Sequence, residues 1–418
     1  MSENNPMDLL QSVQTFLGDT GVAQLFADGW VGAVKTLIMI AIAGVLIYLA
    51  IGRGFEPLLL LPIAIGMLLT NIPGVELFHS DWYMTEGTID YLHILNKGEL
   101  LDILYIGVKT CIYPCLIFVG IGAMTDFGPL LANPKSLILG AAAQVGIFAT
   151  VAGVMGVSAI GEAAGWDAIV FTLREAASIG IIGGADGPTA ILVSQVLKSK
   201  YIGAIAVAAY SYMALVPIVQ PMAIKLVTTK KERCIHMDYN PKNVSKTMRI
   251  VFPIAVTIIV GLVAPQSVAL VGFLMFGNLL RECGVLGTMS ETAQNQLANL
   301  VTLLLGITIS FSMKAEDFVR WETLMIMAIG LFAFVMDTIG GVLLAKFMNL
   351  FRKKKINPMI GGAGISAFPM SSRVIQKLAL EEDPSNILIM HSAGANVSGQ
   401  IASVVAGGLI ISLVSQYL

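Results

Sequence analysis

The chain has 418 residues, of which 56% are hydrophobic and only 12% are charged, and its formal net charge is −2. Soluble domains usually contain about 25% charged residues, so the composition predicts an integral membrane protein, and the small net charge gives no indication of nucleic-acid binding. The four cysteines and four histidines are scattered and lack the spacing of zinc ligands, which argues against zinc-enzyme chemistry.

Residues 1–32 are predicted to form a polar, mildly amphipathic N-terminal segment, followed by a first membrane repeat unit at 33–228. Several apolar runs approach the ~20 residues needed to cross the hydrocarbon core of a bilayer. In this unit they predict membrane segments at 36–51, 57–70, 101–124, 136–157 and 201–227. Pro217 and Pro221 are expected to interrupt the last of them. The stretch from 75 to 102 is predicted to be an acidic loop with Glu76, Asp81, Glu86, Asp90 and Glu99.

The centre of the first unit is the run Gly-Gly-Ala-Asp-Gly-Pro at 183–188. Three glycines and a proline within six residues cannot continue a helix, whereas Pro188 suits the start of a new one. We therefore predict a broken helix at 176–197, with Asp186 on the unwound turn. Irregular backbone at membrane depth must be buried in protein or line a wet cavity, and an ionisable group there indicates a functional site.

A basic loop at 229–249 separates this unit from a second membrane repeat unit at 250–418, and a second basic cluster occupies 352–355. The positive-inside rule places both basic stretches in the cytoplasm. Apolar runs predict segments at 250–264, 268–280, 293–313, 324–348 and 386–414, with a second broken helix at 357–380. The last span is unusually polar, because it contains His391, Ser392, Asn396, Ser398 and Gln400.

Three pairs of short matches recur in the same order in the two halves. Residues 65–69 match 276–280, 124–127 match 314–318, and 183–188 match 361–366. They predict an all-α polytopic membrane protein of about 10–12 transmembrane segments in two repeated units, each with a discontinuous helix. This is the layout of secondary-transporter folds, in which paired broken helices meet near the midplane. The sequence does not decide whether the units are inverted or parallel. If 250–264 also crosses, the units run parallel and both basic clusters stay inside, which charge counting favours. The analogy with transporter folds favours an inverted repeat, and this is the arrangement we expect.

The two breaks and the polar spans present hard oxygen donors and unwound backbone carbonyls. The candidate donors are Asp186, Thr189, Ser211, Tyr212, Asn357, Gly361, Ser366, Asn396 and Ser398. Such ligands suit a small hard cation such as Na⁺ or H⁺. Arg373 supplies a fixed positive charge beside the second break, and half-helix N-termini favour anions, so a carboxylate ligand is expected beside the cation.

Each assignment has a structural alternative. Asn396 and Ser398 also suit hydrogen bonding between membrane helices, and Tyr212 also suits packing. Asp126 and Asp317 are interpreted as helix-capping or loop residues. Asp337, inside an apolar span, is either a second ionisable site or a polar packing residue. If the two breaks form one site, Asp186 should lie near Asn357 and Ser366, with Asn396 and Tyr212 around them.

Five stretches of the chain resemble the membrane β subunit of the biotin-dependent sodium-transporting decarboxylases, which act on oxaloacetate, methylmalonyl-CoA or glutaconyl-CoA. They are residues 55–63, 121–130, 183–191, 212–217 and 357–373, and the run Gly-Gly-Ala-Asp-Gly-Pro-Thr-Ala at 183–190 is the most specific. The resemblance implies a carboxyltransferase α subunit that moves a carboxyl group to biotin on a carrier subunit. The β subunit then decarboxylates this carboxybiotin, consumes a proton and exports Na⁺.

The resemblance also implies roles for individual residues. Asp186, Arg373 and Tyr212 are the expected catalytic residues, and Arg373 and Ser366 are expected to bind carboxybiotin. The expected Na⁺ ligands are Asp186, Asn357, Gly361, Ser366 and Asn396. Further expected features are a small membrane subunit, a homo-oligomer of the β subunit and a bacterial inner-membrane location. The stretch between Gly74 and Leu100 is longer than in the oxaloacetate branch, which favours an acyl-CoA branch.

Two other functions compete with this one. A Na⁺-coupled carboxylate symporter or a Na⁺/H⁺ antiporter would also need an aspartate and broken helices. A non-catalytic membrane anchor for a soluble complex is the other alternative. Buried Asp186, Asn357 and Asn396 argue against an anchor, because an anchor gains nothing from the cost of burying polar groups in a membrane.

Overall fold

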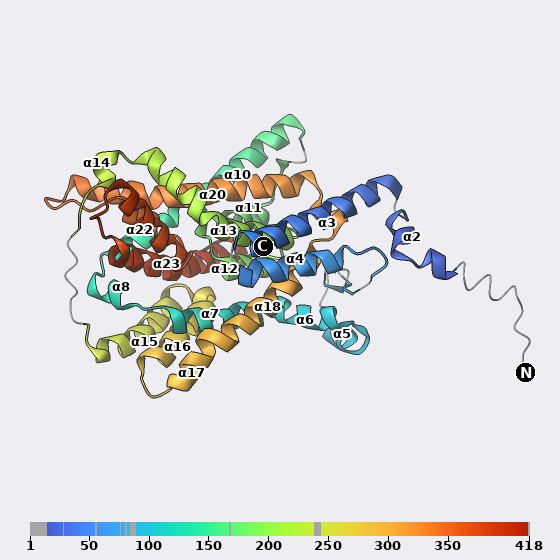
Figure 1. Ribbon diagram of the computed structural model, residues 1–418, viewed down its shortest axis with the longest axis horizontal. Coiled ribbons are helices and arrows are strands. Elements are labelled where there is room, and N and C mark those ends of the chain that lie inside the picture. Colours follow the sequence, from blue (N-terminus) through green and yellow to red (C-terminus); the bar gives the residue numbers. More distant parts are fainter. Residues whose placement is uncertain are drawn as a thin grey trace, which may run out of the picture. The chain divides into compact units, whose positions relative to one another are not determined.

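The computed structural model describes residues 15–27, 29–54, 57–75, 77–79, 82–83, 89–166, 169–237 and 244–416. Within these ranges the regular secondary structure is entirely helical (Figure 1), as the composition and apolar runs predict. Among the described residues, five helical stretches are long and apolar enough to cross a membrane, or up to seven if each of two bent helix pairs is one span. Some of the 10–12 predicted segments are therefore shorter helices, such as the 14-residue helix Pro57–Thr70.

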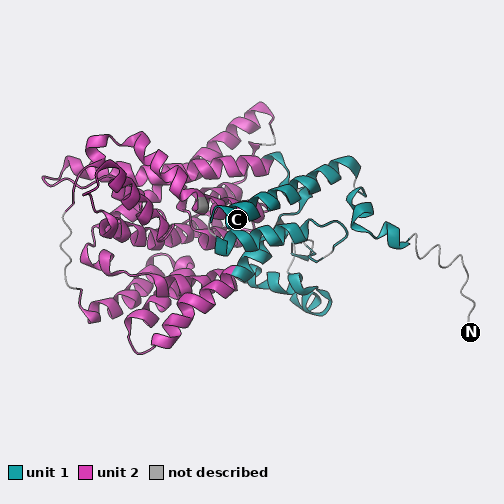
Figure 2. Ribbon diagram, in the orientation of Figure 1, with its two compact units in different colours: residues 1–110, 303–321 teal, residues 111–302, 322–418 magenta. Residues whose placement is uncertain are grey.

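The chain divides into two compact units (Figure 2), one comprising residues 1–110 and 303–321 and the other residues 111–302 and 322–418. The helices of the first are α2 (Gly21–Leu25), α3 (Gly29–Gly52), α4 (Pro57–Thr70), α5 (Tyr91–Lys97), α6 (Leu100–Lys109), η6 (Ser310–Ser312) and α19 (Ala315–Phe318). Buried Asn71 fastens the end of α4 to α19, since its amide donates to the Met313 carbonyl (2.9 Å) and accepts from the Ala315 N–H (2.8 Å). The division into repeat units at 33–228 and 250–418 stays a prediction.

The predicted acidic loop at 75–102 is wrong in its second half, which forms α5 and the start of α6. Asp90 caps α5 by accepting the His93 N–H at 3.0 Å, and local capping of this kind stabilises a helix start. Asp102 is buried and accepts the N–H groups of His79 (2.8 Å) and Glu99 (3.0 Å). Three of the predicted loop acids lie outside the described residues, namely Glu76, Asp81 and Glu86.

The second unit contains the larger set of helices. Before residue 230 they are α7 (Ile112–Met124), α8 (Gly128–Ala132), α9 (Ser136–Ala143), α10 (Val145–Ala164), α11 (Leu173–Gly180), η3 (Ile181–Gly184), α12 (Gly187–Val196) and α13 (Ile202–Val227). After it they are α14 (Lys230–Arg233), α15 (Lys246–Val263), η4 (Pro265–Ser267), α16 (Val268–Glu282), α17 (Gly287–Thr292), η5 (Ala293–Leu297), α18 (Ala298–Ile309, which continues into the first unit), α20 (Trp321–Leu350), α21 (Met359–Gly362), α22 (Met370–Glu382) and α23 (Ile389–Ser415).

Proline and glycine shape the helices of this unit. The two parts of α13, Ile202–Met213 and Leu215–Val227, meet at 72°, consistent with the helix-breaking effect predicted for Pro217. Helices α7 and α16 approach so closely that a Cβ atom on Gly277 would stand 2.0 Å from the Val119 carbonyl oxygen. Small residues permit this contact between membrane helices.

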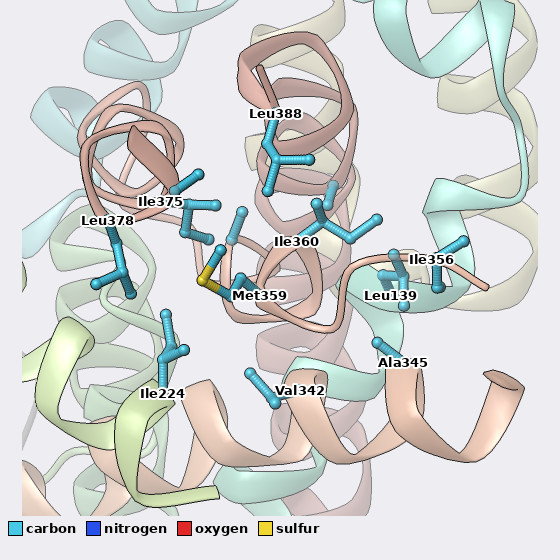
Figure 3. Close-up of a cluster of buried hydrophobic side chains, with 13 residues drawn as sticks. Leu139, Ile224, Val342, Ala345, Ile356, Met359, Ile360, Ile375, Leu378 and Leu388 are labelled. Atoms are coloured by element: carbon cyan, nitrogen blue, oxygen red, sulfur yellow. The ribbon is translucent and has the colours of Figure 1, made fainter. Parts of the chain in front are cut away.

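A buried hydrophobic cluster supports the second break (Figure 3). Ile360 of α21 and Ile375 of α22 meet Leu388, which precedes α23, above Val342 of α20 and Ile224 of α13. Burial of one such side chain typically stabilises a fold by about 1.5–3 kcal/mol. This packing fixes the short helix α21 and the start of α22, and so holds the unwound residues between them.

Candidate functional site

The first break has the predicted form of two half-helices joined by an unwound turn. Helix α11 continues into the short 3₁₀ helix η3, Ala185 takes a left-handed conformation (φ 51°), and α12 then begins. Asp186 is the N-cap of α12, and its Oδ1 accepts the Thr189 N–H at 3.2 Å. A side-chain oxygen at this position satisfies a backbone donor that the broken helix leaves unpaired.

The second break lies between α21 and α22, inside the predicted range 357–380. Buried Asn396 of α23 stabilises it, because its amide nitrogen donates to the carbonyls of Ile365 (2.7 Å) and Ala363 (3.2 Å). Gln220 of α13 donates to the Gly362 carbonyl at 2.8 Å. Side chains of neighbouring helices thus satisfy carbonyls that a continuous helix would have paired internally.

The two breaks meet at Asp186. The backbone N–H of Ser366 donates to the Gly184 carbonyl at 2.9 Å, which joins the two unwound segments directly. The Ser366 hydroxyl donates to Asp186 Oδ2 at 3.2 Å, and the Ser403 hydroxyl of α23 donates to the same oxygen at 2.7 Å. The predicted proximity of Asp186 and Ser366 is therefore confirmed.

Asp186 is only 5% exposed and lines a cavity of about 280 Å³. Ser366 and Gln400 contribute polar groups, and the other lining side chains include Phe118, Ile121, Met124, Met213, Phe368 and Pro369. None of the ion pairs formed by the described residues includes Asp186. A carboxylate without a protein counter-charge in such a place needs a proton or a bound cation, because an isolated buried charge is very costly.

Asn357 and Gly361, which were predicted to bind Na⁺ with Asp186, make their contacts away from Asp186. The amide nitrogen of Asn357 donates to the carbonyls of Arg233 (2.7 Å) and Ile235 (2.9 Å), and its Oδ1 accepts the Met359 N–H at 3.1 Å. Asn357 thus fastens the start of α21 to the basic loop, and none of its hydrogen bonds involves Asp186. Gly361 allows α21 to touch α20, since a Cβ there would stand 2.1 Å from a carbonyl oxygen of α20.

The two tyrosines of α13 lie on different faces. The Tyr212 hydroxyl donates to the Met327 carbonyl of α20, so this side chain links two helices. The Tyr210 ring lies against Gly187, next to Asp186, where a Cβ would stand 2.0 Å from the ring. The Tyr210 hydroxyl is buried without a hydrogen-bond partner among the described residues. Two residues of separation turn a helix by about 200°, so only one of the two tyrosines can face the break.

Arg373 lies in the first turn of α22 with its side chain exposed. It borders a groove of about 430 Å³ whose lining is completed by Gln376, Lys377, Leu380, Glu381 and Ile389. The neighbouring Ser372 hydroxyl donates to Asn396 Oδ1 at 3.2 Å. Arg373 is therefore connected to the second break through Ser372 and Asn396, whereas no hydrogen bond joins it to Asp186.

Sequence reasoning missed Ser403, although a signal was available. Asn396, Gln400 and Ser403 follow the i, i+4, i+7 spacing that defines one face of a helix, so the polar stripe recognised in the last span extends naturally to Ser403. Ser398 is on another face and donates to the Ser136 carbonyl of α9 at 2.9 Å. It therefore forms a hydrogen bond between two helices, as the structural alternative predicted.

Asp126 and Asp317 were both interpreted as capping or loop residues, and the structure tests this for Asp126 only. Asp126 Oδ1 accepts the Gly128 N–H at 2.8 Å, directly before α8, which confirms a loop role. Asp317 belongs to α19, and its side chain lies outside the described part of the chain.

Fold and site together define a polytopic helical membrane protein with transporter-like broken helices that meet at a buried carboxylate. The model of the family described as Na⁺-transporting oxaloacetate decarboxylase beta subunit matches residues 35–414. The chain therefore belongs to this family and is a multi-pass membrane β subunit of a Na⁺-transporting decarboxylase. The predicted resemblance is confirmed, and a symporter or antiporter is not supported.

Individual relatives agree with the family match. The chain is 48% identical to the methylmalonyl-CoA decarboxylase subunit beta of Propionigenium modestum, over 97% of this chain and 100% of the relative. It is 45% identical to the protein of the same name from Veillonella parvula, over 97% and 98%. It is 44% identical to the oxaloacetate decarboxylase beta chain of Haemophilus ducreyi, over 91% and 95%. As a β subunit, the protein is part of a multi-subunit complex.

Proposed function

We propose that this chain decarboxylates carboxybiotin, which a biotinylated carrier subunit presents, and couples the reaction to Na⁺ export. The bond between the ureido nitrogen and the carboxyl carbon breaks, CO₂ leaves, and the electron pair stays on the nitrogen, which takes up one proton. The observation that carries the proposal is the meeting of the two helix breaks at Asp186 and Ser366.

Asp186 is proposed to bind Na⁺ or a proton in alternation. Its carboxylate supplies the negative charge, and the hydroxyls of Ser366 (3.2 Å) and Ser403 (2.7 Å) are close enough to become ligands after rotation. Oxygen donors of this kind suit hard cations. When Na⁺ leaves, a proton on Asp186 removes the cost of an unpaired buried charge, so exchange of the two ions can be tied to the reaction.

The other residues predicted to bind Na⁺ are proposed to act by positioning this site. Asn396 holds the carbonyls on both sides of Ser366 and thereby fixes the Ser366 hydroxyl. Asn357 fixes the start of α21 on the basic loop. Gly361 permits the contact between α21 and α20, and Tyr212 joins α13 to α20.

Carboxybiotin is proposed to bind in the groove beside Arg373. The guanidinium can bind the carboxylate through two hydrogen bonds, and Leu380 and Ile389 offer apolar surface to the biotin ring. Arg233 of the basic loop pairs with Glu382 at the end of α22 (2.7 Å). Since that loop is predicted to be cytoplasmic, a soluble carrier can reach the groove from the cytoplasm.

The remaining partners follow from the same assignment. We propose a carboxyltransferase α subunit, a biotin carrier subunit, a small membrane subunit and a homo-oligomer of this chain as the complex. An acyl-CoA substrate of the α subunit is favoured by the full-length match to a methylmalonyl-CoA decarboxylase β subunit.

The test uses the complete complex reconstituted in liposomes. Addition of the α subunit's substrate should drive uptake of radioactive sodium, and avidin, which blocks biotin, should abolish it. Decarboxylation should be faster in NaCl than in choline chloride. Substrate turnover without sodium uptake and without sodium dependence would show that the chain only anchors the complex.

A further inference from the structure

The C-terminal end of α20 and the short helix α14 border a groove of about 610 Å³ at the two basic stretches of the chain. The charged residues of its lining are Lys231, Glu232, Lys346 and Lys355. The groove shares no lining residue with the cavity at Asp186 or with the groove beside Arg373. It is therefore a site distinct from both.

Polar contacts hold the two sides of this groove together. The Lys346 ammonium pairs with Glu232 at 3.1 Å and thereby ties the end of α20 to α14 (Figure 1). Asn349 exchanges two hydrogen bonds with the backbone of Ile356, at 2.7 and 2.8 Å. These bonds close the turn that carries the basic cluster 352–355, so the backbone beneath the lysines is fixed by the fold.

The groove carries a positive charge that the protein does not compensate. Glu232 is paired with Lys346, and none of the ion pairs formed by the described residues includes Lys231 or Lys355. Both of these lysines are exposed. A ligand with a negatively charged group is therefore favoured between them.

The outer face of α20 runs into the same groove. Leu343, Phe347 and Leu350 follow the i, i+4, i+7 spacing of one helix face, and they are 50%, 55% and 76% exposed. Phe347 and Leu350 also line the groove. The groove thus combines two uncompensated lysines with an apolar surface that points away from the protein.

The position of this face along α20 indicates its depth in the membrane. Residues 324–345 contain one ionisable side chain, and at ~1.5 Å per residue they span roughly 33 Å. The hydrocarbon core of a bilayer is about 30 Å thick, so Lys346 lies at the level of the lipid headgroups. The exposed apolar face therefore extends from the hydrocarbon core to the headgroup region.

We propose that this groove binds an anionic phospholipid of the cytoplasmic leaflet. Its phosphate lies between Lys231 and Lys355, and its acyl chains follow the exposed face of α20. Basic pockets at the cytoplasmic ends of membrane helices attract such headgroups, and both basic stretches are predicted to be cytoplasmic. An acidic soluble partner would account for the lysines but not for an apolar face that continues into the membrane. The site is independent of the proposed Na⁺ and carboxybiotin sites.

The experiment measures binding of tritiated dioleoylphosphatidylglycerol to the purified, detergent-solubilised complex by scintillation proximity. Unlabelled phosphatidylglycerol should displace the label, whereas dioleoylphosphatidylcholine and inorganic phosphate at the same concentration should not. Equal displacement by phosphatidylcholine would overturn the proposal, because the groove would then bind acyl chains regardless of charge. Displacement by inorganic phosphate would show a site for free anions and would also overturn it.

The headgroup contact is tested by removing both groove lysines. The double variant Lys231→Gln, Lys355→Gln should bind phosphatidylglycerol roughly thirty-fold more weakly, since a lysine near a membrane surface contributes about 1 kcal/mol. The matched control is Lys230→Gln, Lys353→Gln, which removes the same charge from exposed neighbours that do not line the groove. This control should bind nearly as well as wild type.

The acyl-chain contact is tested at Leu350. Leu350→Ala should weaken phosphatidylglycerol binding, because it removes apolar surface from the groove. Leu324→Ala, near the other end of α20 and 60% exposed, is the control and should leave binding unchanged. Equal effects of the two changes would contradict this placement of the acyl chains.

The lysine variants also distinguish the lipid from a protein partner. Unchanged phosphatidylglycerol binding in the double variant Lys231→Gln, Lys355→Gln would overturn the site. If that variant also loses the biotinylated subunit, the groove is a docking surface for a soluble subunit instead. If the double variant does not fold, as judged by melting, the two single variants are measured. Each should then bind roughly five-fold more weakly, and unchanged binding in both would overturn the site.

Discussion

Removing the hydroxyl of Ser403 is the most direct test of the site at Asp186. It donates to Asp186 Oδ2 at 2.7 Å, and Ser403 is fully buried. A hydrogen bond to a charged group contributes about 1.5–3 kcal/mol. In Ser403→Ala the ionised carboxylate loses this stabilisation, while the protonated form, which is neutral, loses less. Because Na⁺ requires the ionised form, the variant should need more Na⁺.

The expected rise in the Na⁺ requirement follows from the free energy of this hydrogen bond. At about 1.4 kcal/mol per factor of ten, the Na⁺ concentration that half-activates decarboxylation should rise by roughly ten- to one-hundred-fold. The assay is decarboxylation by the reconstituted complex as a function of NaCl at constant ionic strength. Ser398→Ala is the matched control, because Ser398 is equally buried in the same helix but donates to the Ser136 carbonyl. An unchanged Na⁺ requirement in Ser403→Ala, or an equal shift in Ser398→Ala, would refute the reasoning.

Three further predictions concern the ion, the anion and the packing. Asp186→Asn should keep the melting temperature, because Asn can still cap α12, but it should abolish Na⁺-dependent decarboxylation; normal turnover would contradict the assignment. Arg373→Ala should raise the concentration of carboxybiotin carrier needed for half-maximal turnover while Na⁺ binding is unchanged, and equal loss of both would show that Arg373 braces the break. Gly277→Ala should lower the yield of folded protein, because its Cβ would stand 2.0 Å from a backbone oxygen. Gly153→Ala is the control and should melt like wild type, because no atom lies within 4 Å of the new Cβ.

The sequence determined the local features of this protein. The position of each helix break follows from residues within a few positions of it, because glycine and proline remove or weaken helical hydrogen bonds wherever the chain goes. The capping position of Asp186 and the polar stripe of the last span follow in the same way, from spacing along one helix. The expectation that the breaks meet also rested on a general rule, since stranded backbone groups in a membrane need partners.

Which side chains hydrogen-bond to Asp186 and to the unwound backbone depends on the tertiary structure. Ser366 and Ser403 reach Asp186 across separations of 180 and 217 residues, and Asn357, which looked equally suited, is bound to the basic loop instead. Tyr210 rather than Tyr212 faces Asp186 because of the rotation of α13. A hydrogen bond requires atoms within about 3 Å of each other, and spacing along one chain does not set the distance between segments that are far apart in sequence. That distance is set by the packing of whole helices, at contacts such as those of Gly277 and Gly361.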